Sequence, residues 1–240
     1  MFSDRKHTFI LRLILSACRG IIKETTIMQR KTAMARSTRE FKGSSLLVFA
    51  DDYVALDIET TGLYDDSEII EIGAVHIKNG EPTEEFETLI RPTVRISPFI
   101  TELTGITNAD VADAPSAPEA LADFSDFLGN SFIVGQNVNF DVNFLYDSML
   151  LHLGMPLTND FADTLRISRN LFPDLPDHKL STLIRHFGIS QEVAHRGLSD
   201  SLDAMKCYEH MRSYCNDNGL LVPCENGMRI QKQRIRKKKD

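Results

Sequence analysis

The feature that most constrains the fold is a short apolar run at residues 53–58 that ends in two acids and a glycine turn, D-I-E-T-T-G-L. The run is typical of a buried strand. Because strand side chains alternate between two faces, we expect Asp57 and Glu59 to point the same way. Two carboxylates about 4 Å apart repel by about 4 kcal/mol at an effective dielectric of about 20. The pair therefore indicates a cation between them, most simply a divalent metal.

Two later segments offer further ligands. Asp141 ends the run G-Q-N-V-N-F-D, which follows a short apolar strand at residues 132–134 and opens a helical pattern. Asp200 ends H-R-G-L-S-D, five residues after His195, and enters a second helical pattern. Taken alone, Asp141 could be an ordinary first-turn acid of a helix and His195 a structural or surface histidine. Taken together, the carboxylates are the oxygen ligands that Mg²⁺ and Mn²⁺ prefer.

The order of the three motifs is more specific than any one of them. D-x-E after a strand, N-x-x-F-D before a helix and H-x(4)-D entering a helix resemble the DEDDh group of the DnaQ-like 3'-5' exonuclease superfamily, which includes the epsilon proofreading subunit of bacterial DNA polymerase III. The resemblance covers about residues 50–213. It implies phosphodiester hydrolysis with two divalent metal ions, Mg²⁺ or Mn²⁺. The implied metal ligands are Asp57, Glu59, Asp141 and Asp200, and the implied general base is His195.

The same resemblance implies contacts to the terminal nucleotide. They fall on Thr60, Thr61, Gly62, Leu63, Leu103, Thr104 and Phe140. Thr104 stands where histidine is common in the family, which puts a side-chain contact in doubt there. Gln136 also replaces a usual histidine, which should change hydrogen bonding beside the site but removes no metal ligand. Core packing explains Leu103 and Ile106 equally well.

Length and patterning predict one α/β enzyme domain. With 240 residues, 42% of them hydrophobic, the chain can bury a sizeable core. Three strand patterns come first and form an antiparallel meander, with a turn at Gly80-Glu81-Pro82. Helical and strand patterns then alternate, which predicts a mixed sheet flanked by helices. The family resemblance implies a ribonuclease H-like fold with five strands. The predicted strands are 53–58, 69–77, 85–90 and 132–134, with a short segment at 160–165, and the predicted helices are 117–128, 142–153, 180–187 and 199–215.

Charge divides the chain into three parts. Residues 1–42 include ten basic and three acidic residues, and residues 228–240 include seven basic and one acidic residue. The middle of the chain has ten basic and thirty acidic residues. We expect a basic extension at 1–48, an exonuclease domain at 49–216 and a basic tail at 217–240. Since an acidic body repels a phosphate backbone, the basic ends are candidate tethers for nucleic acid. The alternative is that the tail keeps the protein soluble or docks on a partner protein.

The amino-terminal extension does not predict a membrane segment. Residues 9–22 are apolar, but Arg12 and Arg19 interrupt them and the run is too short to span a bilayer. The sequence up to Cys18 resembles a lipoprotein signal only weakly, and Met28 and Met34 are alternative starts. The four cysteines lack paired C-x-x-C spacing. A reducing cytoplasm is therefore the expected location.

These features lead to a first hypothesis and two alternatives. The first is a metal-dependent 3'-5' exonuclease that releases nucleoside 5'-monophosphates from single-stranded or frayed DNA 3' ends, in proofreading or repair and alone or with a DNA polymerase subunit. The second is an exonuclease that trims RNA 3' ends. The third is a catalytically silent nucleic-acid-binding module of a polymerase, which the five matched positions argue against.

Overall fold

The structure is a computed structural model that describes residues 39–64, 66–189, 196–221 and 236–237, and the described residues from Phe41 onward belong to one compact unit. Its centre is a six-stranded sheet of order β1-β6-β5-β2-β3-β4. The predicted mixed α/β architecture is confirmed, with one strand more than expected. The strands are β1 (Ser45–Leu46), β2 (Asp52–Thr60), β3 (Ile69–Lys78), β4 (Glu81–Leu89), β5 (Ile133–Gly135) and β6 (Phe161–Asp163), and a separate pair joins β7 (Leu220–Leu221) to β8 (Arg236–Lys237).

The extra strand is β1, whose two residues pair in parallel with β6. Two residues are too few for an alternating pattern, so periodicity gave no signal for this strand. Ser45 and Leu46 lie within the range 1–48 that charge assigned to the extension, and the division of the chain at these boundaries stays a prediction.

The strands β2, β3 and β4 form the predicted antiparallel meander, whereas β5 and β6 join the sheet in parallel. The predicted turn between β3 and β4 is present, but it is shifted by one residue from Gly80-Glu81-Pro82. The turn lies at Asn79 and Gly80, which both have positive φ angles of 51° and 81°. Such a two-residue turn matches the twist of a hairpin. Pro82 belongs to β4, an edge strand, where a residue without an N–H group is tolerated.

Six described helices surround the sheet, and four of them were predicted within a few residues. Sequence patterns missed the short helices α2 and α5. The sequence features that mark these two helices are their N-caps. The Ser97 hydroxyl accepts a hydrogen bond from the Ile100 N–H at the start of α2 (Pro98–Thr104), and Asp163 caps the start of α5 (Thr164–Leu171). The helices are α2 (Pro98–Thr104), α3 (Ala117–Leu128), α4 (Asn139–Leu153), α5 (Thr164–Leu171), α6 (Leu180–Phe187) and α7 (Gly197–Asp217).

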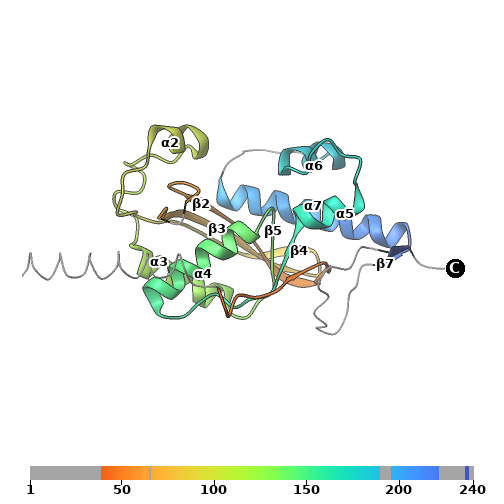
Figure 1. Cartoon of the computed structure of the whole chain (residues 1–240), viewed down its shortest axis with the longest axis horizontal. Helices are drawn as coiled ribbons and strands as arrows, with labels where there is room; N and C mark the ends of the chain where they lie inside the picture. Colours follow the sequence, from red (N-terminus) through yellow and green to blue (C-terminus); the bar gives the residue numbers. More distant parts are fainter. Residues whose placement is uncertain (1–38, 65, 190–195, 222–235, 238–240) are drawn as a thin grey trace, which may run out of the picture. The chain divides into compact units, whose positions relative to one another are not determined.

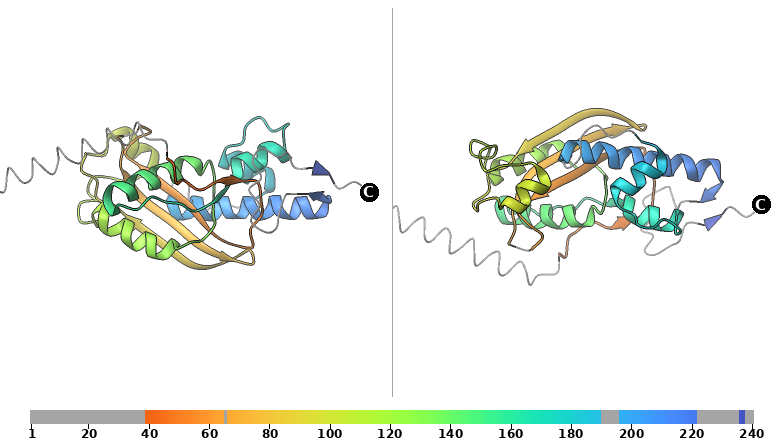
Figure 2. Two further views of the ribbon diagram at one scale, coloured as in Figure 1. Left: turned by 60° about the horizontal axis from the view of Figure 1, so that its bottom comes forward. Right: turned by 90° about the horizontal axis from the view of Figure 1, so that it is seen from above.

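The helices cover the sheet on both faces, with α3 and α4 on one side and α7 on the other (Figures 1 and 2). The alternation of β2 follows this division. Val54, Leu56 and Ile58 pack into the cluster formed with α3 and α4. Tyr53 and Ala55 pack into the cluster formed with α7. The strand is thus anchored on both faces immediately before its acidic end.

Among the residues that the structure describes, no helix combines the length and apolar character needed to cross a bilayer.

Replacing Leu128 should destabilise the domain without touching its acidic end. Leu128 is buried in the α3 cluster, so Leu128→Ala should lower the free energy of unfolding by about 2 to 5 kcal/mol through lost burial and a residual cavity. Chemical denaturation measures the change. Asp123→Ala on the exposed side of the same helix is the control and should change it by about 0.5 kcal/mol or less. Equal losses for the two variants would contradict the packing assignment.

Candidate metal and active site

The first motif lies where β2 runs out of the core. The odd-numbered side chains of β2 face α7, and this alternation carries Asp57 and Glu59 onto the same face. Asp200 reaches them from the first turn of α7. Carboxylate oxygens of these three residues all lie within 4.8 Å of one another, and each side chain is partly buried. The predicted convergence of the first and third motifs is therefore present in the structure.

Asp141 is fixed beside them by the backbone of β2. It lies in the first turn of α4 and is 4% exposed. Its Oδ1 accepts a hydrogen bond of 3.0 Å from the Ile58 N–H. The parallel partner β5 has its last register pair with β2 at Ala55, so this N–H lies beyond the paired part of β2 and is satisfied by the carboxylate instead. Asp141 is thus held beside the acidic cluster by β2, and its role as a metal ligand stays a prediction.

Crowding of carboxylates raises their affinity for protons. Burial, followed by repulsion from Asp141, Asp200 and Glu59, raises the pKa of Asp57 well above its usual range. Burial raises the pKa of Asp141 too, against the hydrogen bond from Ile58. The pKa of Glu59 rises to about 7 through burial and then repulsion from Glu71 and Asp200. A bound cation would reverse all of these shifts by favouring the ionised forms.

The donor set fits a hard divalent cation. It consists of carboxylate oxygens alone, partly withdrawn from water and close enough for several of them to contact one ion. Such a concentration of negative charge is costly without a counter-charge. Asp57, Glu59 and Asp200 are therefore the residues that would hold a metal, with Asp141 adjacent.

The proposed base, His195, lies outside the described residues, which resume at Arg196. Its role as general base stays a prediction.

The predicted nucleotide contacts differ in their exposure. Leu63 is 78% exposed in the loop after β2 and Leu103 is 48% exposed on α2, so both side chains are available to a ligand. Ile106 is buried in a core cluster. The Thr104 hydroxyl is buried, donates to the Ile100 carbonyl and accepts from the Ile106 N–H. Its side chain is engaged within the protein, in line with the doubt raised by a threonine at this position.

Among the other predicted contacts, two threonines serve the turn itself and Phe140 lies in the first turn of α4. The Thr60 hydroxyl donates to the Gly62 carbonyl at 2.6 Å, and the Thr61 hydroxyl accepts from the Glu68 N–H, so both threonines shape the loop that presents Leu63. Phe140 is partly buried, and its ring lies 4.6 Å from that of Phe144.

Gln136 and Asp163 tie together the elements behind the site. Gln136 donates to the His178 carbonyl at 2.7 Å and accepts from the Thr164 hydroxyl at 2.5 Å. Asp163 accepts from the N–H groups of Asn137 and Leu165. Gln136 thus links the turn after β5 to α5 and to the loop before α6, and Asp163 links the same turn to α5, which supports a structural role for Asp163.

Sequence reasoning missed Glu71, a buried acid of β3 that lies opposite Glu59 in the sheet register. Its strand reads I-I-E-I-G-A, so a lone acid within an apolar run was the available signal.

Comparison with known proteins places the chain in a family. A family model described as Exonuclease (RNase_T) matches residues 54–208, which is more than half of the chain. The chain belongs to this exonuclease family. It is 44% identical over 154 residues to a DNA polymerase III PolC-type from Clostridium perfringens, covering 64% of this chain and 11% of that protein. It is 35% identical over 150 residues to the DNA polymerase III subunit epsilon of Aquifex aeolicus, covering 62% of this chain and 74% of that subunit.

Solved structures share the fold. The nuclease domain of 3'hExo, described as a DEDDh family member bound to rAMP, superposes with a TM-score of 0.58 at 24% identity, covering 68% of this chain and 92% of that one. The chain thus matches nearly a whole nuclease domain, whereas it spans about a tenth of the PolC-type relatives.

Without metal, the domain should lose stability as the pH rises from about 5 to about 8. The pKa of Glu59 is about 7 in the folded protein against an ordinary value of 4.5, so the folded state retains a proton that the unfolded chain releases. The stabilisation from this group is complete below the unfolded pKa and is lost as the pH passes the folded pKa. The raised pKa values of Asp57 and Asp141 act in the same direction.

Melting temperatures in a chelator across this pH range measure the effect. Glu59→Gln removes one titrating group and should reduce the slope, and added Mn²⁺ should raise the melting temperature most at high pH. A melting temperature that climbs toward pH 8 in the chelator would contradict the pKa assignment.

Proposed function

We propose that the chain is a metal-dependent 3'-5' exonuclease that hydrolyses the terminal phosphodiester of a nucleic-acid 3' end and releases a nucleoside 5'-monophosphate. The observation that carries the proposal is the convergence of Asp57, Glu59 and Asp200 within 4.8 Å, with buried Asp141 hydrogen-bonded to the same strand. Family membership supports the reaction class.

Each residue has a definite part in this reaction. Asp57, Glu59, Asp141 and Asp200 would hold two divalent ions, Mg²⁺ or Mn²⁺, and balance their charge. Such ions would supply neutralisation of the phosphoryl charge and a lowered pKa for water. His195 would accept a proton as the general base. The exposed Leu63 and Leu103 side chains pack against the terminal bases, with Thr60, Thr61 and Gly62 shaping the turn, and Phe140 of α4 provides a further contact to the nucleotide.

We assign DNA as the substrate class, as single-stranded or frayed 3' ends met in proofreading or repair. The curated relatives support this because their names place them in DNA polymerase III. The same names support a DNA polymerase subunit as a partner, and we assign the cytoplasm as the location. Free Cys207 and Cys215, both buried in α7, fit a reducing compartment.

The alternative substrate is an RNA 3' end, and the structural neighbour bound to rAMP is the observation that favours it. Matched DNA, RNA and mismatched-duplex oligonucleotides labelled at the 5' end, each tested with Mg²⁺ and with Mn²⁺, separate the two. Faster shortening of RNA than of DNA of the same sequence would replace the DNA assignment. No shortening of either polymer, with binding retained, would favour the silent binding module.

Removing a carboxylate at the centre of the cluster should abolish the reaction. Asp57→Ala and Asp200→Ala should each reduce mononucleotide release from a 3'-labelled oligonucleotide by about 1,000-fold or more, because a metal ligand and its charge are lost. Asp52→Ala is the control, since Asp52 is an exposed acid at the other end of the same strand. Activity that survives in both ligand variants would show that the metal site lies elsewhere.

His195→Ala should separate proton transfer from metal binding. As a general base, His195 contributes about 100-fold or more to turnover, so kcat should fall by that factor while the affinity for Mn²⁺ stays within about twofold. Calorimetric titration with Mn²⁺ provides the second measurement. Loss of Mn²⁺ affinity together with activity would make His195 a ligand.

A further inference from the structure

The cluster depends on an acid outside it. Glu71 of β3 is fully buried, and both of its carboxylate oxygens accept hydrogen bonds from the start of α7. Oε1 accepts from the Arg196 guanidinium, at 2.9 Å from Nε and 2.8 Å from Nη2. Oε2 accepts from the Gly197 N–H at 2.9 Å. A buried carboxylate is costly unless it is paired, and this one is paired entirely with the residues that begin α7.

The backbone of α7 also lies in contact with β3. Gly73 lies two residues after Glu71, on the same face of β3 and opposite Asp57 in the register. A Cβ atom at Gly73 would lie 1.9 Å from the Leu198 nitrogen and 2.0 Å from the Gly197 carbonyl carbon. Only a residue without a side chain permits this approach. The first turn of α7 is therefore seated directly on β3 beside Asp57.

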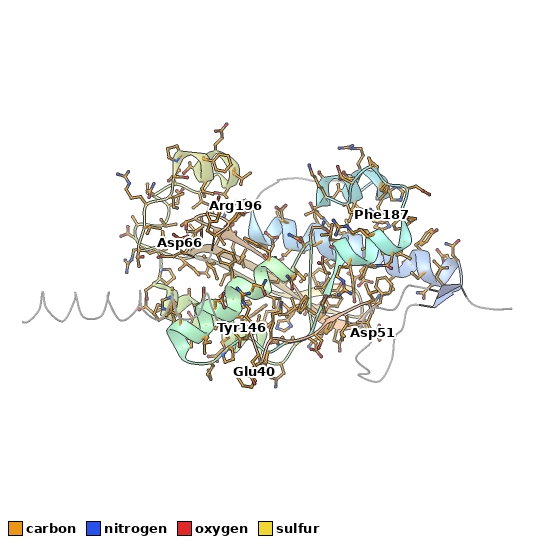
Figure 3. All side chains as sticks on the ribbon, viewed as in Figure 1. Glu40, Asp51, Asp66, Tyr146, Phe187 and Arg196 are labelled. Carbon is orange, nitrogen blue, oxygen red and sulfur yellow. The ribbon has the colours of Figure 1, made fainter. Side chains whose placement is uncertain are left out.

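The contact between the first turn of α7 and β3 sets the position of Asp200. This residue follows Gly197 by three positions, and its N–H donates to the Arg196 carbonyl at 2.9 Å. A displacement of the first turn of α7 would move the Asp200 carboxylate by a similar distance. Metal–ligand distances tolerate only about 0.2 Å. Arg196 lies at the N-terminal end of α7 in Figure 3, where this first turn meets the sheet.

We propose that Glu71 is a positioning residue of the metal site: it clamps Arg196 and Gly197 so that Asp200 completes the cluster with Asp57 and Glu59. The inference rests on the proposed function only in that the cluster binds divalent metal. Glu71 does not act as a ligand, because both of its oxygens are engaged by donors from α7.

The test is Glu71→Gln in the full chain, measured by Mn²⁺ binding. The amide keeps the shape but replaces one acceptor oxygen with a donor, so either Arg196 or Gly197 faces an NH₂ group in place of the oxygen that now accepts from it. Loss of a residue that orients a ligand typically weakens metal affinity about 10- to 100-fold. We expect the Kd for Mn²⁺, read from the electron paramagnetic resonance signal of free ion and from calorimetry, to rise by about 10-fold or more.

Two controls separate positioning from general destabilisation. Glu87 also pairs with Arg196, at 3.1 Å, but both side chains of this pair are nearly half exposed, so Glu87→Gln should leave the Kd within about twofold. Leu128→Ala destabilises the opposite face of the sheet and should leave the Kd unchanged for folded protein. If Leu128→Ala weakens Mn²⁺ binding as much as Glu71→Gln does, the positioning role is overturned.

Arg196→Lys provides a second route should Glu71→Gln fail to fold. Its side chain is 45% exposed, and the substitution removes the forked contact without altering β3. We expect a rise of about threefold or more in the Kd for Mn²⁺. An unchanged Kd in every folded variant of Glu71 and Arg196 overturns the proposal.

A double-substitution cycle tests whether Glu71 acts through Asp200. If it does, Glu71→Gln should weaken Mn²⁺ binding much less in an Asp200→Asn background than in the unsubstituted chain. Equal factors in both backgrounds would overturn the coupling. If the unsubstituted chain binds Mn²⁺ but releases no nucleotide, the proposed function fails, while the Mn²⁺ affinities still test the positioning role of Glu71. If the unsubstituted chain does not bind Mn²⁺, both fail.

Discussion

Mutual repulsion among partly buried carboxylates is the constraint that the rest of this domain has to withstand. Asp57, Glu59 and Asp200 bring oxygens within 4.8 Å, and Asp141 places a fourth carboxyl group against the same strand. At about 4 Å each pair costs about 4 kcal/mol at an effective dielectric of about 20. Apolar packing on both faces of β2 and the hydrogen bond from Ile58 to Asp141 hold the groups together. The fold therefore maintains a site that favours a divalent cation.

Strand alternation explains why the site and the core cannot be separated. Along β2, one set of side chains fills the cluster under α3 and α4, and the other fills the cluster under α7 before continuing into the two acids. A slip of one residue would place the acids in the apolar core and expose Leu56 and Ile58. The burial that stabilises the strand thus also fixes the direction in which the acids point.

The contacts of β3 with α7 fix the position of Asp200, which β2 does not hold. Glu71 and Gly73 lie on the face toward α7, one bonded to its first residues and the other leaving space for its backbone. A helix that begins in contact with the strand neighbouring Asp57 brings Asp200 from a segment more than 140 residues away to the same point. Such precision is needed because metal coordination tolerates much smaller displacements than core packing does.

The sequence by itself determined the α/β class, most of the strands and long helices, and the set of acids that converge, because these depend on local periodicity and on motif order. It misplaced the β3–β4 turn, since the Asn79–Gly80 pair was a competing signal beside Pro82. It missed β1, α2 and α5, which are too short for a periodic pattern. Only the tertiary structure decided the role of Glu71. The role of Glu71 depends on the register of β3 against β2 and on the packing of α7 against β3. Neither can be read from the residues that are close to Glu71 in the sequence.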